Sequence, residues 1–316
     1  MTAPLPVFVA AGEALTDLIR TGPESWDSKV GGATWNVARV VAKLGLPSAF
    51  AGAISQDCFG DALWQASEAA GLDMRFMQRY AASPLLAIVH ELHPPKYFFV
   101  GDNSADLHFD ASALPAGWMQ AVKWAHFCGI SLAREPLAGR LVALAEQLKA
   151  AGARISYDPN YRAVMDERYD VTLRKMAALA DLIKVSDEDL LGLFRTDDQT
   201  AAFAQLRAMN PSAAVLYTRG ADGASLYYGD EVWHAKPPKI EVVDTVGAGD
   251  ASAGGMIYSL ATMPERGWGE HLRFAVAAGA AACLAAGANP PGLGVIEGVG
   301  DKMIGSKFLS HLNVTH

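Results

Sequence analysis

The chain has 316 residues, of which 51% are hydrophobic and 19% charged, so it can bury a large core and global disorder is not expected. Its formal net charge of −8 argues against nonspecific binding to nucleic acid or to an anionic membrane surface. Its three cysteines include no CxxC pair, which argues against a disulfide framework or a zinc site and favours a reducing cytoplasm.

The first hundred residues predict alternating strands and helices. Residues 7–11 form an apolar run typical of a strand. From Trp35 the apolar residues recur at helical spacing, and Gly45 followed by Pro47 predicts the end of that helix. Further along we expect a strand over 48–54, a helix over 60–71 and two short strands over 87–92 and 97–100.

From about Trp118 onward, apolar strands alternate with helices of about 10–15 residues, which predicts an α/β fold with a mostly parallel sheet covered on both faces. The longest uncharged apolar run, residues 275–288, is shorter than the roughly twenty residues of a membrane-spanning helix. Ligands bind such sheets at the carboxyl ends of the strands. The candidate site loops are therefore DPNYR at 158–162, VSDED at 185–189, TRGADG at 218–223 and DTVGAGD at 244–250.

Domain organisation is expected to be simple. No linker or fixed-period repeat stands out, which predicts one domain over residues 1–316. The β-type residues at about 13–33 and 86–105 fit poorly in a doubly wound core and are expected to form a small accessory sheet. Residues 299–316 are expected to be a peripheral tail.

The segment DTVGAGD is followed by ten small or apolar residues without a charge, which predict a buried helix. Gly247 and Gly249 allow backbone angles and close approaches that a Cβ would block. A helix that begins after such a turn points unpaired N–H groups and the positive end of its dipole at the loop, which makes an anion site, most plausibly for a phosphate. The alternative is an ordinary turn in which Asp250 caps the helix.

An acid on an anion-binding turn needs a chemical purpose, because it repels the anion that the turn attracts. In phosphoryl transfer a carboxylate can accept the proton of the attacking hydroxyl, and this is the role that Asp250 suggests. Other signatures are absent from the sequence: there is no GxxxxGK[ST] and no GxGxxG after a strand, and HELH at 90–93 is not the HExxH of zinc proteases.

Two motifs together resemble a known family. DTVGAGD and the segment GGATWNVA at 31–38 are similar to the two signatures of the PfkB, or ribokinase-like, carbohydrate kinases, and the resemblance extends to about residue 298. Further matches look most like the fructokinases: GEALTD at 12–17, DPNYR at 158–162 and KVSDEDL at 184–190. The resemblance implies a three-layer αβα sandwich with a mostly parallel central sheet and a small β-sheet lid.

The resemblance also assigns roles to residues on the sugar side. Asp250 would be the catalytic base, the N–H groups of Gly247, Ala248 and Gly249 the anion hole, and Arg162 a partner for the phosphate or a sugar substituent. The sugar pocket would be formed by Asp17, Gly31, Gly32, Asn36, Asp158 and Asn160. The simpler alternatives are a surface carboxylate for Asp17, a helix-start residue for Asn36 and a surface arginine for Arg162.

For the nucleotide and for cations the resemblance is less complete. The residues expected to border ATP are Ser186, Thr218, Gly220, Gly223 and Asn289. Ser186 and Asp189 stand where the family often has Asn and Glu in a pattern linked to magnesium, so a role of Asp189 in Mg²⁺ binding would act through water; otherwise Asp189 belongs to a solvated first turn of a helix. Asp244 and Thr245 would contribute to a site for a monovalent cation such as K⁺, which only some members of the family have.

The function implied is ATP-dependent phosphorylation of the primary hydroxyl of a ketose, with fructose preferred. A 2-keto-3-deoxygluconate kinase is the first alternative, and a ribokinase or nucleoside kinase the second. Gly101 stands where fructokinase-like and 2-keto-3-deoxygluconate-type kinases commonly carry a lid arginine, which weakens the case for a carboxylate-bearing substrate and leaves the choice of fructose open. A catalytically silent sugar-binding relative and an unrelated Rossmann-type oxidoreductase are disfavoured by Asp250 and by the missing dinucleotide motif. The family also implies a lid that closes over the sugar and a homodimer.

Overall fold

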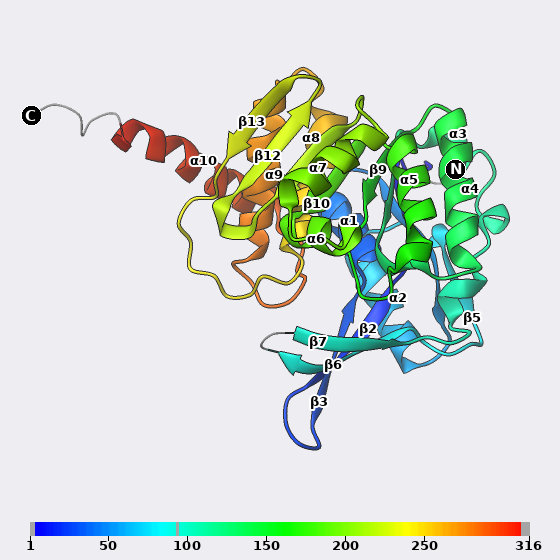
Figure 1. The fold of residues 1–316 in the computed structure, drawn as a ribbon. Coiled ribbons are helices and arrows are strands. Elements are labelled where there is room, and N and C mark those ends of the chain that lie inside the picture. The colour runs from blue at the N-terminus through cyan, green and yellow to red at the C-terminus, as the bar shows by residue number, and fades with distance from the viewer. Residues whose placement is uncertain (1–3, 93–94, 311–316) are drawn as a thin grey trace, which may run out of the picture.

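The computed structural model describes residues 4–92 and 95–310, which form a large sheet between two layers of helices and a smaller sheet at one edge (Figure 1). The nine strands of the large sheet have the order β13-β12-β11-β10-β9-β8-β1-β4-β5. Their bounds are β1 (Phe8–Ala11), β4 (Ser48–Ser55), β5 (Met77–Tyr80), β8 (Trp124–Cys128), β9 (Arg154–Asp158), β10 (Leu182–Ser186), β11 (Ala214–Thr218), β12 (Ala224–Tyr228) and β13 (Glu231–Ala235).

In this spatial order, every pair of neighbours between β5 and β11 is parallel, as the sequence predicts. The β11–β12 and β12–β13 pairs at the other end of the sheet are antiparallel. No α-helix separates β11, β12 and β13, and only a short 3-10 helix at Gly220–Asp222 lies between β11 and β12. The register pairs Tyr228 with Glu231, so only two residues connect β12 to β13, and Gly229 supplies the left-handed φ of 56° that such a turn favours. The sequence analysis names no strand between β11 and α8 (Ala248–Thr262), so this antiparallel hairpin is an addition to the predicted parallel sheet.

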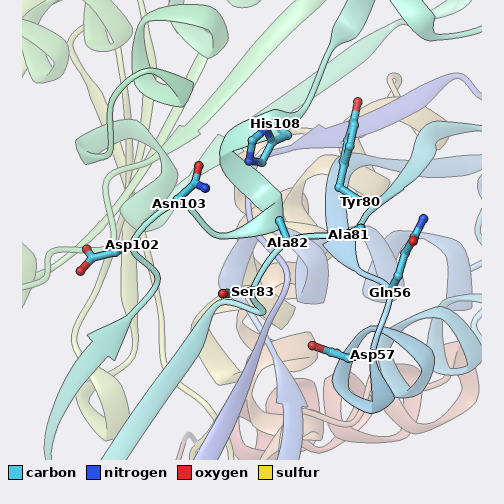
Figure 2. A pocket seen from close by; sticks show the side chains of 9 residues that line it. All are labelled: Gln56, Asp57, Tyr80, Ala81, Ala82, Ser83, Asp102, Asn103 and His108. Carbon is cyan, nitrogen blue, oxygen red and sulfur yellow. The ribbon is translucent and has the colours of Figure 1, made fainter.

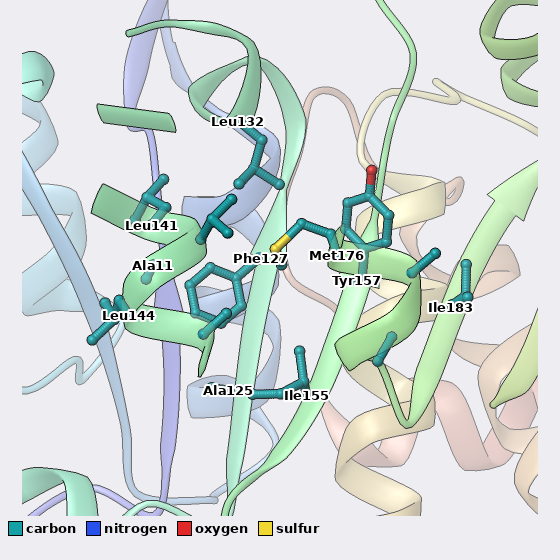
Figure 3. Packing of buried hydrophobic residues seen from close by; sticks show 14 of the residues in the cluster. Ala11, Ala125, Phe127, Leu132, Leu141, Leu144, Ile155, Tyr157, Met176 and Ile183 are labelled. Atoms are coloured by element: carbon teal, nitrogen blue, oxygen red, sulfur yellow. The ribbon is translucent and has the colours of Figure 1, made fainter. Parts of the chain in front are cut away.

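Each face of the sheet has its own core because side chains alternate along every strand. In β1, Val9 and Ala11 point into one core, and Phe8 and Ala10 point into the other. The first core, part of which Figure 3 shows, packs against α4 (Leu137–Ala150), α5 (Asp170–Leu179), α6 (Asp187–Phe194) and α7 (Gln199–Met209). The second packs against α1 (Ala33–Lys43), α2 (Cys58–Ala69), α8 (Ala248–Thr262), α9 (Trp268–Ala282) and α10 (Leu293–Ser310), and a short helix, α3 (Trp118–Ala121), precedes β8. This confirms the predicted three-layer α/β/α fold.

The smaller sheet projects from the carboxyl-end edge of the large one (Figure 1). It has the order β3-β2-β6-β7 and consists of β2 (Leu15–Arg20), β3 (Trp26–Gly31), β6 (Leu86–Leu92) and β7 (Pro95–Val100). These strands lie within the two segments expected to form an accessory sheet.

The C-terminal segment differs in part from its prediction. Helix α10 starts at Leu293, and Val299 and Met303 are buried against the second core, so the beginning of the expected peripheral tail is a packed part of the fold. Residues 311–316 of that tail lie outside the described residues. None of the helices in the described part of the chain is both long and apolar enough to cross a membrane.

Candidate active site

A cleft of about 670 Å³ opens where the small sheet faces the carboxyl ends of the parallel strands and the start of α8. Its lining comes from the small sheet, from the start of α1, from the loops after β8 and β9, from Lys184 within β10, and from residues 244–247 with the start of α8. Of the predicted site residues, those lining this cleft are Asp17, Gly32, Asn36, Asn160, Arg162, Asp244, Thr245, Gly247, Gly249 and Asp250. The structure thus brings together residues from both signature motifs, which are about 210 residues apart in sequence.

Asp250 lies at the third position of α8, not at its cap. The N-cap is Gly247, which has a φ of 81° and is so close to the turn after α9 that a Cβ would lie 3.0 Å from Ala288. The alternative role of Asp250 as a helix cap is therefore wrong. Its Oδ2 accepts a hydrogen bond of 2.8 Å from Asn36 Nδ2. Burial raises the pKa of Asp250, and the Asn36 bond partly offsets that rise by favouring the carboxylate.

The anion hole expected at residues 247–249 is shaped as the first turn of α8, but one donor is already engaged. The Ala248 N–H donates to the Thr245 carbonyl at 3.2 Å. The N–H groups of Gly249 and Asp250 belong to the first helical turn, where a helix offers no internal acceptor. A Cβ on Gly249 would lie 3.3 Å from Lys184 Nζ, so this glycine keeps the space beside the lysine open.

The GG pair at 31–32 serves the backbone geometry of the small sheet. Gly32 has a φ of 112°, and a Cβ there would lie 2.9 Å from the Glu13 carbonyl oxygen. A Cβ on Gly31 would lie 2.5 Å from Asp17 Oδ2. Both glycines thus let the end of β3 lie close against the start of β2. Gly31 does not line the cleft, so its direct role toward the sugar stays a prediction.

Asp17 projects from β2 into the cleft and is partly desolvated there. Burial raises its pKa to about 6, and the positive charge of Arg162 limits the rise. Because the pKa in the folded state lies above that of the unfolded chain, ionised Asp17 destabilises the fold at pH values above both. A carboxylate held at this cost is one that a bound polyol can stabilise through its hydroxyl donors.

We expect Asp17→Asn to stabilise the free protein and to weaken sugar binding. At pH 8 the variant should gain about 1–2 kcal/mol of unfolding free energy, since it removes a desolvated charge. The gain should shrink as the pH falls from 8 to 4.5, where wild-type Asp17 becomes neutral. Urea unfolding at both pH values measures this, with the exposed Asp27→Asn in the same sheet as control. Equal stability of wild type and Asp17→Asn at pH 8 would contradict the assignment.

Asn36 combines one satisfied and one unsatisfied polar atom. Its side chain is 7% exposed; Nδ2 donates to Asp250, while Oδ1 is buried without a hydrogen-bond partner among the described residues. An orphaned buried acceptor that lines a cleft fits a hydroxyl donor from a ligand. The unpaired Asn36 Oδ1 therefore favours a ligand with several hydroxyl groups.

We expect Asn36→Leu to shift the acid limb of kcat/KM to higher pH. The substitution removes a hydrogen bond that favours the ionised form of Asp250, so the pKa of Asp250 should rise further. Activity should fall more at pH 6 than on the high-pH plateau, which is the internal control. A pH profile superimposable on that of the wild type after normalisation would show that Asn36 does not tune this carboxylate.

The DPNYR loop contributes Asn160 and Arg162 to the cleft, but not Asp158. The Arg162 guanidinium is held by the Asn160 carbonyl, Asn160 Oδ1 and the Tyr161 carbonyl at 2.7–3.2 Å, and its Cζ lies 5.9 Å from the centre of the Tyr97 ring. Asp158 is 1% exposed and pairs with Lys184 at 3.0 Å. Its contact with a sugar therefore stays a prediction.

The residues predicted to border the nucleotide lie outside this cleft. Ser186 and Thr218 are paired in register at the carboxyl ends of β10 and β11, and the Ser186 hydroxyl caps α6. Gly220 and Gly223 follow β11 with φ values of 49° and 92°. Asn289 Nδ2 donates to the Ala286 carbonyl in the turn after α9. Their nucleotide contacts stay predictions.

The predicted cation ligands are engaged within the fold. Asp189 accepts from the Tyr161 and Ser186 N–H groups at 2.8 Å each, and it forms a capping box with Ser186. Asp244 accepts from the Val246 N–H at 3.0 Å and the Gly287 N–H at 2.8 Å. Within residues 4–92 and 95–310, no group of three or more His, Cys, Asp or Glu could hold a metal ion. A role of Asp189 toward Mg²⁺, and of Asp244 and Thr245 toward K⁺, stays a prediction.

The family model described as pfkB family carbohydrate kinase matches residues 8–293. The chain belongs to this family. A fructokinase from Klebsiella pneumoniae is 34% identical over 256 residues, which are 79% of this chain and 83% of that protein. The structure of a Xylella fastidiosa fructokinase with bound ATP has a TM-score of 0.84 at 28% identity and covers 93% of this chain and 98% of that one. The structure of a Salmonella enterica aminoimidazole riboside kinase, complexed with aminoimidazole riboside and an ATP analogue, has a TM-score of 0.81 at 28% identity and covers 93% and 99%.

Two charged residues in the cleft of this carbohydrate kinase, Lys184 and Glu13, have no role in the sequence analysis. Lys184 lies in β10, and the signal that could have revealed it in the sequence is a charged residue inside the apolar run LIKVS. Glu13 is 2% exposed, and its carboxylate accepts hydrogen bonds from both the N–H and the hydroxyl of Thr34 and of Ser131. Burial raises the pKa of Glu13. Because Glu13 precedes β2 and Thr34 follows β3, the carboxylate holds together the two ends of the lid hairpin.

A second hollow of about 700 Å³ lies away from this site (Figure 2). Its lining includes Gln56, Asp57, Tyr80, Asn103 and His108, and none of the predicted site residues. Most of these side chains are exposed, and the Asp57 carboxylate already caps α2. The cleft beside α8 is therefore the better candidate for the active site of this carbohydrate kinase.

Proposed function

We propose that this protein uses ATP to phosphorylate the primary hydroxyl of a ketose, with fructose as the preferred substrate. The observation that supports this proposal most is the position of Asp250. Its partly desolvated carboxylate lies on the first turn of α8 and faces the cleft beneath the small sheet, which would be the lid. Similarity to proteins named fructokinase supports the choice of sugar. The intact Asp250 and glycine turn argue against a catalytically silent relative.

The proposed reaction assigns a task to each group. The proton of the sugar hydroxyl passes to the Asp250 carboxylate, the hydroxyl oxygen forms a bond to the γ-phosphorus, and the bond from that phosphorus to the bridging oxygen breaks, so that ADP leaves with the electron pair. The first-turn N–H groups of α8 stabilise the negative charge on the transferred group. Magnesium bound to the ATP phosphates would neutralise part of this charge. This ion usually keeps several of its water ligands.

The composition of the lid wall supports a second candidate, a riboside with a planar, weakly polar aglycone. Strand register places two rows of side chains over the cleft: Asp17, Ala87 and Phe99 in one, and Ile19, Val89 and Tyr97 in the other. Asp17 is the one charged residue in these rows. Such a surface suits an apolar ring better than a sugar carboxylate. For the same reason 2-keto-3-deoxygluconate, which carries a carboxylate, is a weaker candidate. The similarity to an aminoimidazole riboside kinase points the same way.

ADP release with ATP, Mg²⁺ and a panel of acceptors tests the proposal. The panel contains fructose, tagatose, ribose, 2-keto-3-deoxygluconate, aminoimidazole riboside and common nucleosides. We expect the highest kcat/KM with fructose. A riboside with a higher value would replace fructose by the second candidate, and turnover with none of them would refute the kinase proposal. Substitution of K⁺ by Na⁺ in the same assay tests the cation site expected at Asp244 and Thr245.

From the resemblance to the family we also propose a homodimer, a cytoplasmic location and closure of the lid over the sugar. Closure would exclude water from the phosphoryl group. Hydrogen exchange at residues 15–30 with and without sugar measures it directly. Protection on sugar binding is the expected result, and unchanged exchange would count against closure.

A further inference from the structure

Lys184 is an ammonium group inside a buried parallel strand. It is 5% exposed, and its neighbours Ile183 and Val185 are fully buried. Removing an ammonium from water costs several kcal/mol unless it is well paired. An apolar residue would fill this position at less cost, so packing alone does not account for the lysine.

Two carboxylates hold the ammonium. Lys184 Nζ lies 3.0 Å from Asp158 Oδ2 and 3.8 Å from Asp189 Oδ2. This pairing raises the pKa of Lys184, so the group stays protonated. Burial raises the pKa of Asp158 to about 7 despite the lysine. Buried ion pairs can often be replaced by apolar side chains without loss of stability, so the pairing does not by itself explain why the lysine is there.

The location of the ammonium explains the presence of Lys184 better than its ion pairs do. Lys184 lines the cleft, and its Nζ lies 3.3 Å from the place that a Cβ on Gly249 would take, one residue before Asp250. The other cation of the cleft, Arg162, is held by three oxygens of its own loop and faces Tyr97. Lys184 is thus the cation beside the first-turn N–H groups of α8.

We propose that Lys184 is a further catalytic residue, whose ammonium donates hydrogen bonds to the phosphoryl group during its transfer from ATP to the sugar. This inference rests on the proposed kinase function. Lys184 keeps its proton throughout: the hydroxyl proton goes to Asp250, and the leaving electron pair goes to ADP. The ammonium supplies positive charge where three equatorial oxygens carry negative charge, and the proposed closure of the lid would exclude water from this site. The carboxylates of Asp158 and Asp189 hold it in place before the phosphate arrives.

The charge requirement can be tested with Lys184→Gln and Lys184→Arg. Gln keeps a donor for Asp158 but removes the charge, and we expect kcat to fall by about 10²–10³-fold, the usual range for one lost stabilising donor, with KM for the sugar changed by less than about threefold. Arg keeps the charge and should retain kcat within about tenfold. Lys149→Gln, which removes the ammonium from another lysine–aspartate pair away from the cleft, should leave kcat unchanged. Equal losses in folded Gln and Arg variants, or no loss in the Gln variant, would overturn the inference.

A second measurement does not depend on turnover or on the folding of a variant. The wild-type protein is crystallised with ADP, Mg²⁺, aluminium fluoride and its acceptor sugar, so that the fluoride complex occupies the place of the phosphoryl group. We expect Lys184 Nζ within about 3 Å of a fluoride. An ammonium that contacts only Asp158 and Asp189 would refute the inference. Because sugar-dependent turnover of the wild type is measured first, a failure of the proposed kinase function is distinguished from a failure of this role.

Discussion

Replacing Asp250 by Asn is expected to lower kcat by about 10²–10⁴-fold, the usual contribution of a general base. The amide has the same shape and still lies on the first turn of α8, but it cannot accept the hydroxyl proton. Folding should be preserved, because removing a desolvated carboxylate removes a cost: burial raises the pKa of Asp250, so its ionised form is disfavoured in the folded state. Steady-state kinetics with the preferred sugar, together with thermal unfolding, measure both effects.

The control for Asp250 is Glu270→Gln, which neutralises a carboxylate in the first turn of the neighbouring helix α9 on an exposed surface. It should leave kcat unchanged. In the wild type, kcat/KM should decline on the acid side at a pH above that of an ordinary aspartate, since the base must be ionised and its pKa is raised. An Asp250→Asn variant with wild-type turnover would remove this residue from the mechanism.

Gly249→Val has the second largest expected effect. Its Cβ would lie 3.3 Å from Lys184 Nζ and 3.7 Å from Lys184 Cε, and the two methyl groups would take up the space beside the first-turn N–H groups. We expect kcat to fall by about 10²–10³-fold, comparable to the loss of an oxyanion donor. Helix stability should change little, since valine is no worse than glycine in a helix.

The matched control is Gly298→Val in α10, where a Cβ would meet no atom within 4 Å. It makes the same chemical change in a helix remote from the cleft, and turnover should be unaffected. Both variants are compared with the wild type by kinetics at saturating ATP and sugar. Unchanged kcat in Gly249→Val would mean that no phosphoryl group is held at this turn.

Much of this fold follows from patterns visible in the sequence. Apolar strands alternating with helices predict the parallel sheet, and the β-type residues at 15–30 and 86–100 predict a separate small sheet. The turn at Gly229 was not anticipated, because two short strands joined by a turn carry a weaker pattern than a strand followed by a helix. The packing of Val299 and Met303 was also missed, since α10 contains several glycines and no strong amphipathic pattern.

The site was predictable where a motif has a single geometric solution. DTVGAGD leads to a glycine at the N-cap and to Asp250 on the first turn of α8. Lys184 and Glu13 lie within recognised motifs, but their roles depend on contacts with Asp158, Thr34 and Ser131, which are distant in sequence. The same holds for the apolar lid wall, because strand register decides which side chains of β2, β6 and β7 face the cleft.

The proposed mechanism requires that the sugar hydroxyl meets the Asp250 carboxylate at the place where the phosphoryl group is transferred. The most direct test is a crystal structure of the Asp250→Asn variant with ATP, Mg²⁺ and the preferred acceptor, in which slow turnover preserves the complex. We predict that the primary hydroxyl lies within hydrogen-bond distance of residue 250 and faces the γ-phosphorus from the side opposite the leaving oxygen. A hydroxyl bound elsewhere in the cleft, or a γ-phosphate remote from the first turn of α8, would contradict the account.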